Sequence, residues 1–240
     1  MTGWIAGIDG CRAGWIVAIR PPDAPAATRL EVVADLADIL GRPGLVCVAI
    51  DMPIGLPERV GRGGRGPEQA LRPLLGARQS SVFAIPARAA VYADDYRAAC
   101  AAALAASDPP KKVSKQAFFL FPKIRALDAL LRADAALATR VFEAHPEAAF
   151  RMMAGAPLRH PKKVRGAPSA PGLDERVGLL AATGLPRALL DAPPPPGAGR
   201  DDALDALACA WTAERILAGT ALRHGPGARD AHGLPVAIWS

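Results

Sequence analysis

The stretch Trp4-Ile-Ala-Gly-Ile-Asp9-Gly-Cys-Arg-Ala-Gly14-Trp-Ile-Val-Ala-Ile19 decides the fold of this chain. It predicts a strand over 4–9 that ends in one carboxylate, a glycine-rich turn, and a second strand over 14–20. Gly10 and Gly14 suit a tight hairpin, because glycine adopts the positive φ angles that such turns use. Asp9 would lie at the mouth of a buried sheet, where an acid is unfavourable unless a metal ion or a phosphate-bearing ligand compensates it. An ordinary turn aspartate is the alternative interpretation.

A second acid follows a second buried strand. Leu45-Val-Cys-Val-Ala-Ile50 is a continuous apolar run, which is typical of a strand buried on both faces. It ends at Asp51, and the proline-containing segment Met52–Pro57 cannot continue the strand. The repetition favours a functional role for both acids.

The remaining pattern predicts one α/β domain over 1–240, with a mixed central sheet flanked by helices. We expect a third strand over 29–34, a strand over 140–147, and helices over 35–40, 92–106, 114–138 and 201–217. Residues 58–78 are rich in Arg and Gly and predict an exposed loop that leads into a short helix. A helical insertion therefore occupies about 58–138.

The last helix carries three acids on one flank. At 100° per residue, Asp202 lies about 60° and Asp201 about 40° from Asp205. Acids at the start of a helix often act as caps, which accounts for Asp201 or Asp202. Capping explains Asp205 poorly, because this residue is one turn further along.

These acids are expected to meet in one pocket. Asp9, Asp51 and Glu143 each end a predicted strand, and ligand sites of parallel sheets lie at the carboxyl ends of strands. Asp202 and Asp205 of the last helix would join them. Two carboxylates about 4 Å apart repel by roughly 4 kcal/mol at an effective dielectric of 20, so converging acids need protons or cations. Oxygen ligands without thiolate suit Mg²⁺ or Mn²⁺, and two such ions can cleave a phosphodiester.

Six motifs, in this order along the chain, resemble one prokaryotic family, the domain-of-unknown-function family 429. They are Gly7-Ile-Asp9-Gly-Cys-Arg-Ala-Gly-Trp15, Ile50-Asp51-Met-Pro-Ile-Gly-Leu-Pro57, Leu75-Gly-Ala-Arg-Gln-Ser-Ser-Val-Phe83-Ala-Ile-Pro86, Ser114-Lys-Gln116, Glu143-Ala-His-Pro-Glu147 and Asp201-Asp-Ala-Leu-Asp-Ala206. Members of this family are regarded as predicted nucleases with a ribonuclease H-like fold. The resemblance therefore implies a sheet whose first three strands are antiparallel and whose later strands are parallel.

The wider similarity to Holliday-junction resolvases of that fold implies roles for the acids. Asp9 would be the first-strand aspartate, Asp51 the acid after the fourth strand, and Asp202 and Asp205 the pair on the last helix; these four would hold the metal ions. Glu143 and His145 join the catalytic candidates, with His145 orienting water or touching a phosphate. Structural alternatives are a hydrogen-bonded histidine at 145 and a helix cap at Glu147. Glu68 stands where the family usually has an aspartate.

Basic residues are the candidates for binding a nucleic-acid backbone. The net charge of +6 suits a polyanionic partner, although an arginine-rich composition explains it equally. Arg12 follows the Asp9 turn directly, Lys115 belongs to a cluster with Lys111 and Lys112, and Lys163 belongs to a cluster with Lys162 and Arg165. Solvated surface charge is the alternative for both clusters.

Two other function classes stay open. The glycine-rich turn between the first strands also occurs in the actin and sugar-kinase fold, which would make the chain a nucleotide or phosphometabolite enzyme. A non-catalytic binding module that keeps the acids for structure is the other. The sequence shows neither a signal peptide nor an apolar run long enough to span a membrane, which predicts a cytoplasmic protein. The four cysteines lack the spacing of a zinc site.

Overall fold

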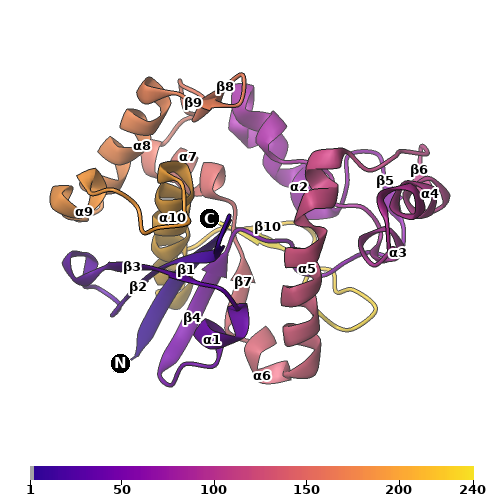
Figure 1. Ribbon diagram of the computed structural model, residues 1–240, viewed down its shortest axis with the longest axis horizontal. Helices are drawn as coiled ribbons and strands as arrows, with labels where there is room; N and C mark the ends of the chain where they lie inside the picture. Colours follow the sequence, from indigo (N-terminus) through magenta and orange to yellow (C-terminus); the bar gives the residue numbers. More distant parts are fainter. Residues whose placement is uncertain (1–2) are drawn as a thin grey trace.

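A five-stranded mixed sheet forms the centre of the computed structural model, which describes residues 3–240 (Figure 1). Its strands are β1 (Trp4–Cys11), β2 (Gly14–Arg20), β3 (Arg29–Val33), β4 (Leu45–Ile50) and β7 (Val141–Glu143). They are arranged in the order β3-β2-β1-β4-β7. The first three strands are antiparallel, whereas β4 pairs in parallel with β1 and β7. This confirms the predicted α/β class and mixed sheet.

The β1–β2 hairpin is longer than the sequence predicted. Pairing continues to Cys11 and Gly14, so the turn consists of Arg12 and Ala13, and Asp9 lies inside β1 rather than at its end. Gly14 adopts a φ of 134°, and a Cβ there would lie 2.3 Å from the Val33 carbonyl oxygen. Glycine is therefore required by both its backbone conformation and the close approach of β3.

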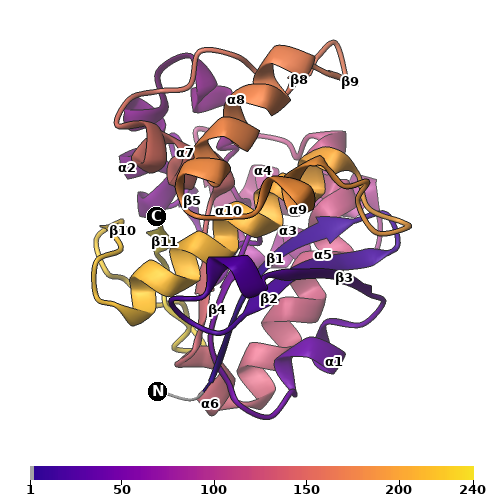
Figure 2. The ribbon, with the colours of Figure 1, turned by 90° about the vertical axis from the view of Figure 1, so that its left-hand side faces the viewer.

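Helix α10 (Arg200–Leu217) lies across one face of the sheet (Figure 2). A Cβ at Gly7 would come within 2.0 Å of the Ala210 nitrogen and 2.1 Å of the Ala206 oxygen, so the helix backbone rests directly on β1. Helices α7 (Pro146–Ala154), α8 (Ala170–Ala182) and α9 (Arg187–Asp191) share the apolar core on this side with α10. This close approach brings the first turns of α10 to the ends of β1 and β4.

The opposite face packs against α1 (Leu36–Leu40) and α5 (Lys115–Ala133). The expected helix over 114–138 is interrupted at Asp134, which has extended backbone angles and caps the short α6 (Ala135–Ala138). The expected strand over 140–147 is confined to β7, because Pro146 begins α7. Two separate two-stranded sheets pair β8 (Lys163–Val164) with β9 (Ala167–Pro168) and β10 (Arg223–His224) with β11 (Ile238–Trp239).

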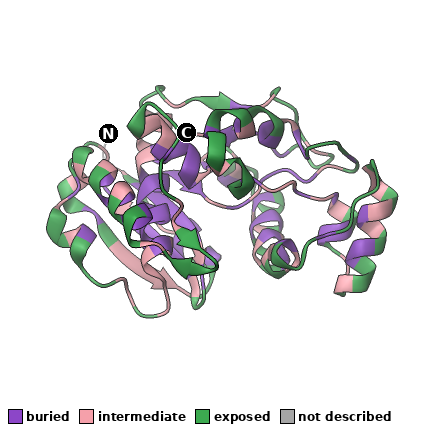
Figure 3. Ribbon diagram, turned by 90° about the horizontal axis from the view of Figure 1, so that it is seen from above, coloured by how far each residue is buried: buried purple, intermediate pink, exposed green. Residues whose placement is uncertain are grey.

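The region between β4 and α5 contains short helices. They are α2 (Gly66–Leu71), a 3₁₀ segment over Arg72–Ser81, α3 (Arg88–Val91) and α4 (Tyr96–Ala106), with a small pairing of β5 (Val60–Gly61) and β6 (Ser107–Asp108). Figure 3 shows buried residues both along α10 and the sheet and within these helices. The expectation of an exposed loop over 58–78 is wrong at Arg65 and Glu68, which are 5% and 1% exposed.

Within residues 3–240, no helix combines the length and the apolar character that a membrane crossing requires.

Candidate metal centre

Parallel pairing of β1 with β4 places two acids next to each other. Ile8 pairs with Ile50, and the Asp51 amide donates to the Ile8 carbonyl at 2.9 Å. Asp9 and Asp51 therefore directly follow the last residues that β1 and β4 pair with each other. Asp9 also accepts a hydrogen bond from the Gly10 amide at 2.6 Å.

Helix α10 contributes the third acid. Because its backbone contacts Gly7, Asp205 in its second turn reaches the same edge of the sheet. One carboxylate oxygen from each of Asp9, Asp51 and Asp205 lies within 4.8 Å of the others. We call these residues the carboxylate triad. The sequence predicted that all three would converge, and they do.

The triad is electrostatically unfavourable without a cation. Burial, followed by the charges of Asp51 and Asp205, raises the pKa of Asp9 well above its usual value. Burial, followed by Asp205, raises the pKa of Asp51 to about 8. Asp205 is 1% exposed, its pKa is also raised, first by burial, and its Oδ1 has no hydrogen-bond partner among the described residues. A buried, undercoordinated group of three carboxylates could hold a metal ion.

Two neighbouring lysines reach α10 from the segment between α7 and α8. Lys162 donates through its Nζ to Asp205 Oδ2 and lies in the field of Asp9 and Asp51. Lys163 Nζ lies 2.6 Å from Asp201 Oδ2 and remains half-exposed. The sequence analysis named Lys163 as the residue that contacts the substrate, whereas in the structure it is Lys162 that contacts the triad, at Asp205. The basic cluster was visible in the sequence, but nothing local distinguished the two side chains.

Asp202 lies beside the triad but is already engaged. Its carboxylate accepts a hydrogen bond from the Gly199 amide at 2.8 Å, which caps the start of α10. Its charge still raises the pKa of Asp9. The capping alternative therefore describes what Asp202 does in this structure, while Asp205 has no capping role. The metal-ligand role of Asp202 stays a prediction.

Glu143 belongs to a buried network beneath the triad. Its Oε1 accepts from Arg65 Nη2 at 2.5 Å and its Oε2 accepts from the Ile54 amide at 2.7 Å. Glu68 accepts from Arg65 Nε at 2.6 Å, and Arg65 donates further to the carbonyls of Ile54 and Gly55. The network fixes the segment that follows Asp51. Sequence reasoning missed Arg65 and assigned no role to Glu68.

Glu143 keeps some influence on the triad through its charge. Burial is the largest effect on its pKa, which rises to about 7 despite the adjacent Arg65. The Glu143 charge in turn raises the pKa of Asp51. In this structure the carboxylate of Glu143 faces Arg65, so its contribution to the site is to position the Asp51 segment.

His145 precedes α7 and lines the same cavity as Asp9 and Asp51. Its Nε2 lies 3.4 Å from the Ser81 carbonyl oxygen, and its Nδ1 is buried without a partner among the described residues. Burial lowers the pKa of His145 to about 4, so the ring is neutral near pH 7. If Nε2–H donates to Ser81, Nδ1 is left as a proton acceptor. Glu147 pairs with the fully buried Arg176 of α8, in addition to lying in the first turn of α7.

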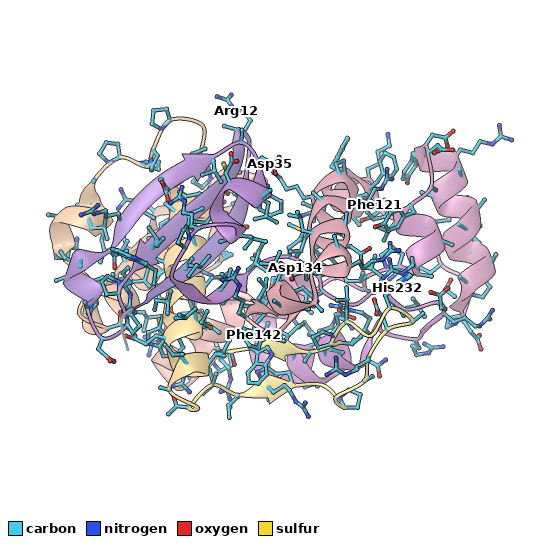
Figure 4. The ribbon with its side chains drawn as sticks, turned by 90° about the horizontal axis from the view of Figure 1, so that it is seen from below. Arg12, Asp35, Phe121, Asp134, Phe142 and His232 are labelled. Carbon is cyan, nitrogen blue, oxygen red and sulfur yellow. The ribbon has the colours of Figure 1, made fainter. Side chains whose placement is uncertain are left out.

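A cavity of about 380 Å³ gathers most of the predicted site residues. Its lining includes Asp9, Asp51, His145, Lys162, Lys163, Asp201, Asp202 and Asp205. Arg12 and Lys115 are exposed and do not belong to the described lining. Figure 4 shows the Arg12 side chain extending away from the fold at the β1–β2 turn. Ser114 and Gln116, which flank Lys115, do line the cavity. Contacts of Arg12 and Lys115 with a substrate stay predictions.

The model of one protein family matches residues 7–230, nearly the whole chain; this family is described as "Protein of unknown function (DUF429)". No curated protein and no solved structure matches the chain.

Proposed function

This chain belongs to the DUF429 family, and we propose that it is a metal-dependent nuclease that hydrolyses phosphodiester bonds of nucleic acid. The carboxylate triad is the observation that carries the proposal. Three elements distant in sequence, β1, β4 and α10, bring buried acids within 4.8 Å of one another. A protein keeps such a repulsive group only where a cation or a proton compensates it.

The donor set fits Mg²⁺ or Mn²⁺. Asp9, Asp51 and Asp205 offer hard carboxylate oxygens, and Asp205 Oδ1 is buried without a partner within residues 3–240. Asp202 lies beside them and would complete the cage if it exchanged its capping bond for a metal. Two ions held in this way would supply an activated water and stabilise the leaving oxygen of a phosphodiester.

The protein's own residues suit a phosphodiester substrate. Lys162 and Lys163 bring positive charge to the same cavity as the acids, where they would hold a phosphate. Neutral His145 would orient a water or accept its proton through Nδ1. The net charge of +6 supports a polyanionic partner, and the strand order β3-β2-β1-β4-β7 is consistent with a ribonuclease H-like fold. A cytoplasmic location stays a prediction.

The test is cleavage of labelled single-stranded, double-stranded and branched DNA and RNA with Mn²⁺, Mg²⁺ or EDTA. We expect cleavage of at least one substrate by the wild type with a divalent ion, and its loss in Asp9→Asn and Asp51→Asn. Asp94→Asn, an exposed aspartate outside the cavity, is the control and should cleave as the wild type does. Stabilisation by ATP without any cleavage would instead favour the nucleotide-binding alternative.

A further inference from the structure

The Lys162 ammonium contacts one candidate metal ligand and lies near the other two. Its Nζ donates to Asp205 Oδ2, while Asp9 and Asp51 lie close enough to act on its charge. Burial lowers the pKa of Lys162, but the three carboxylates outweigh this effect and raise the pKa above its usual value. The ammonium group therefore compensates part of the charge of the triad in the metal-free protein.

The backbone of Lys162 is fixed, so this contact does not depend on a loosely held surface residue. Residues 155–169, which we call the strap, connect α7 to α8 and carry β8 and β9 (Figure 1). Glu175 of α8 accepts hydrogen bonds from the amides of Arg159 and His160, each at 2.9 Å. The Ser169 amide donates to the Lys162 carbonyl at 2.9 Å.

Close packing against α8 anchors the strap at the preceding residue. A Cβ at Gly172 would lie 1.9 Å from the Pro161 oxygen and 3.0 Å from the Lys162 nitrogen. The α8 backbone therefore touches the strap directly. These contacts hold the main chain on both sides of Lys162, and its flexible four-carbon stem can deliver the ammonium to more than one acceptor in the cavity.

Lys163 provides a natural comparison within the same strap. It pairs with Asp201, which is not a member of the triad, and its side chain is 46% exposed against 29% for Lys162. The two lysines share a sequence neighbourhood and a partner helix. They differ in whether their partner is a candidate metal ligand.

We propose that Lys162 is an internal competitor of divalent metal for Asp205, and that the displaced ammonium binds a phosphate oxygen of the substrate. The competition follows from the ion pair at Asp205: the ammonium already compensates this carboxylate, and a divalent ion that binds Asp205 would meet a positive charge there. The binding of the displaced ammonium to a substrate phosphate rests on the proposed nuclease function. The displaced side chain stays in the cavity, where a point charge with three N–H donors suits a phosphate.

The first experiment measures Mn²⁺ affinity by isothermal titration calorimetry. Lys162→Met and Lys162→Gln remove the competing charge, and the Gln variant keeps a donor for Asp205 in case the Met variant folds poorly. We expect both to bind Mn²⁺ about tenfold more tightly than the wild type, which corresponds to about 1.4 kcal/mol. Lys162→Arg, which keeps the charge, and Lys163→Met, which leaves the triad unchanged, should stay within a factor of three. Equal or weaker Mn²⁺ binding by the neutral variants at position 162 would overturn the proposal.

The second experiment measures binding of a labelled single-stranded oligonucleotide by fluorescence anisotropy in Ca²⁺, which has the same preference for oxygen ligands. Lys162→Met should bind the oligonucleotide more weakly and lower the slope of log affinity against log salt by about one, because one phosphate contact is lost. Tighter metal binding together with weaker oligonucleotide binding is the expected signature. An unchanged oligonucleotide affinity in Lys162→Met overturns the phosphate role. If the wild type binds no oligonucleotide, the nuclease proposal fails, while the Mn²⁺ titration still decides the competition.

Discussion

Replacing Asp51 by asparagine should stabilise the metal-free protein, and more so as the pH rises. Asp51 is the triad member whose carboxylate makes no hydrogen bond or ion pair with the described residues, whereas Asp9 accepts from Gly10 and Asp205 pairs with Lys162. The substitution therefore removes a charge without breaking a contact. Asparagine also has nearly the shape of the protonated acid.

The magnitude follows from the separation of the triad oxygens. Two unit charges 4.8 Å apart repel by about 3.5 kcal/mol at an effective dielectric of 20. Lys162 offsets part of the charge of Asp205, whereas Asp9 has no ion pair among the described residues. Repulsion alone gives Asp51→Asn a gain of about 2–3 kcal/mol where Asp51 is ionised, somewhat less than the full pair energy because Asp9 also takes up a proton. Relief of the buried charge, the largest cause of the raised Asp51 pKa, adds to this gain.

The raised pKa of Asp51 determines how the stability of the folded protein changes with pH. The pKa of Asp51 is about 8 in the folded protein and near 3.8 in the unfolded chain, so the folded state binds the proton more tightly. Wild-type stability should therefore fall as the pH rises from about 4 to about 8. At pH 5 only the unfolded wild type has ionised Asp51, so Asp51→Asn should already gain about 1.6 kcal/mol there, and more at pH 9.

Urea unfolding in EDTA at pH 5 and pH 9 measures this difference. Asp94→Asn, at an exposed position, is the control and should leave stability unchanged at both pH values. It shows whether the loss of one negative charge changes the stability of this basic protein by itself. A loss of stability in Asp51→Asn at pH 9, or an equal change at both pH values, would refute the idea that the triad carboxylates repel one another.

Further predictions concern the residues that support the triad. Arg65→Met should destabilise the protein by about 3–5 kcal/mol in urea unfolding, because it leaves Glu68 and Glu143 buried without their cation; Arg62→Met, at an exposed position nearby, is the control. Gly7→Ala should lower stability by about 3 kcal/mol or more and weaken Mn²⁺ binding, because the added methyl pushes α10 off β1; Gly178→Ala, with open space around it, should do neither. Mn²⁺ at 100 times its dissociation constant should raise the free energy of unfolding of the wild type by about 2.7 kcal/mol and should not raise that of Asp9→Asn. Thermal scans with and without EDTA measure this, and equal stabilisation of both proteins would contradict it. His145→Ala should lower the cleavage rate while changing Mn²⁺ affinity little, since its free nitrogen is assigned to water rather than to metal; a large loss of Mn²⁺ affinity would make it a ligand instead.

The triad could be predicted because each member is marked by a local pattern. The apolar run before Asp51 and the prolines after it fix the end of β4 without reference to the rest of the chain. Asp205 stands out because it is too far into its helix to serve as a cap, and the structure gives the capping role to Asp202. The register of β1 with β4 then brings Asp9 beside Asp51, which follows from the parallel pairing that the motifs imply.

The supporting residues could not be predicted because their roles depend on partners far away in sequence. Arg65 stands in a polar, glycine-rich stretch that is typical of an exposed loop. In the fold it is buried, where it meets Glu143, 78 residues later, in addition to the nearby Glu68. Likewise, Lys162 pairs with Asp205 and Lys163 with Asp201 in a strap that packs on Gly172 of α8, a contact that the local sequence does not reveal.

The most direct test of the carboxylate triad as a metal centre is a crystal soaked in Mn²⁺ and measured at the manganese absorption edge. We expect an anomalous peak within bonding distance of carboxylate oxygens of Asp9 and Asp51, with Asp205 released from Lys162 and facing the ion. A soaked crystal with no peak at the triad, and with Lys162 still on Asp205, would contradict it.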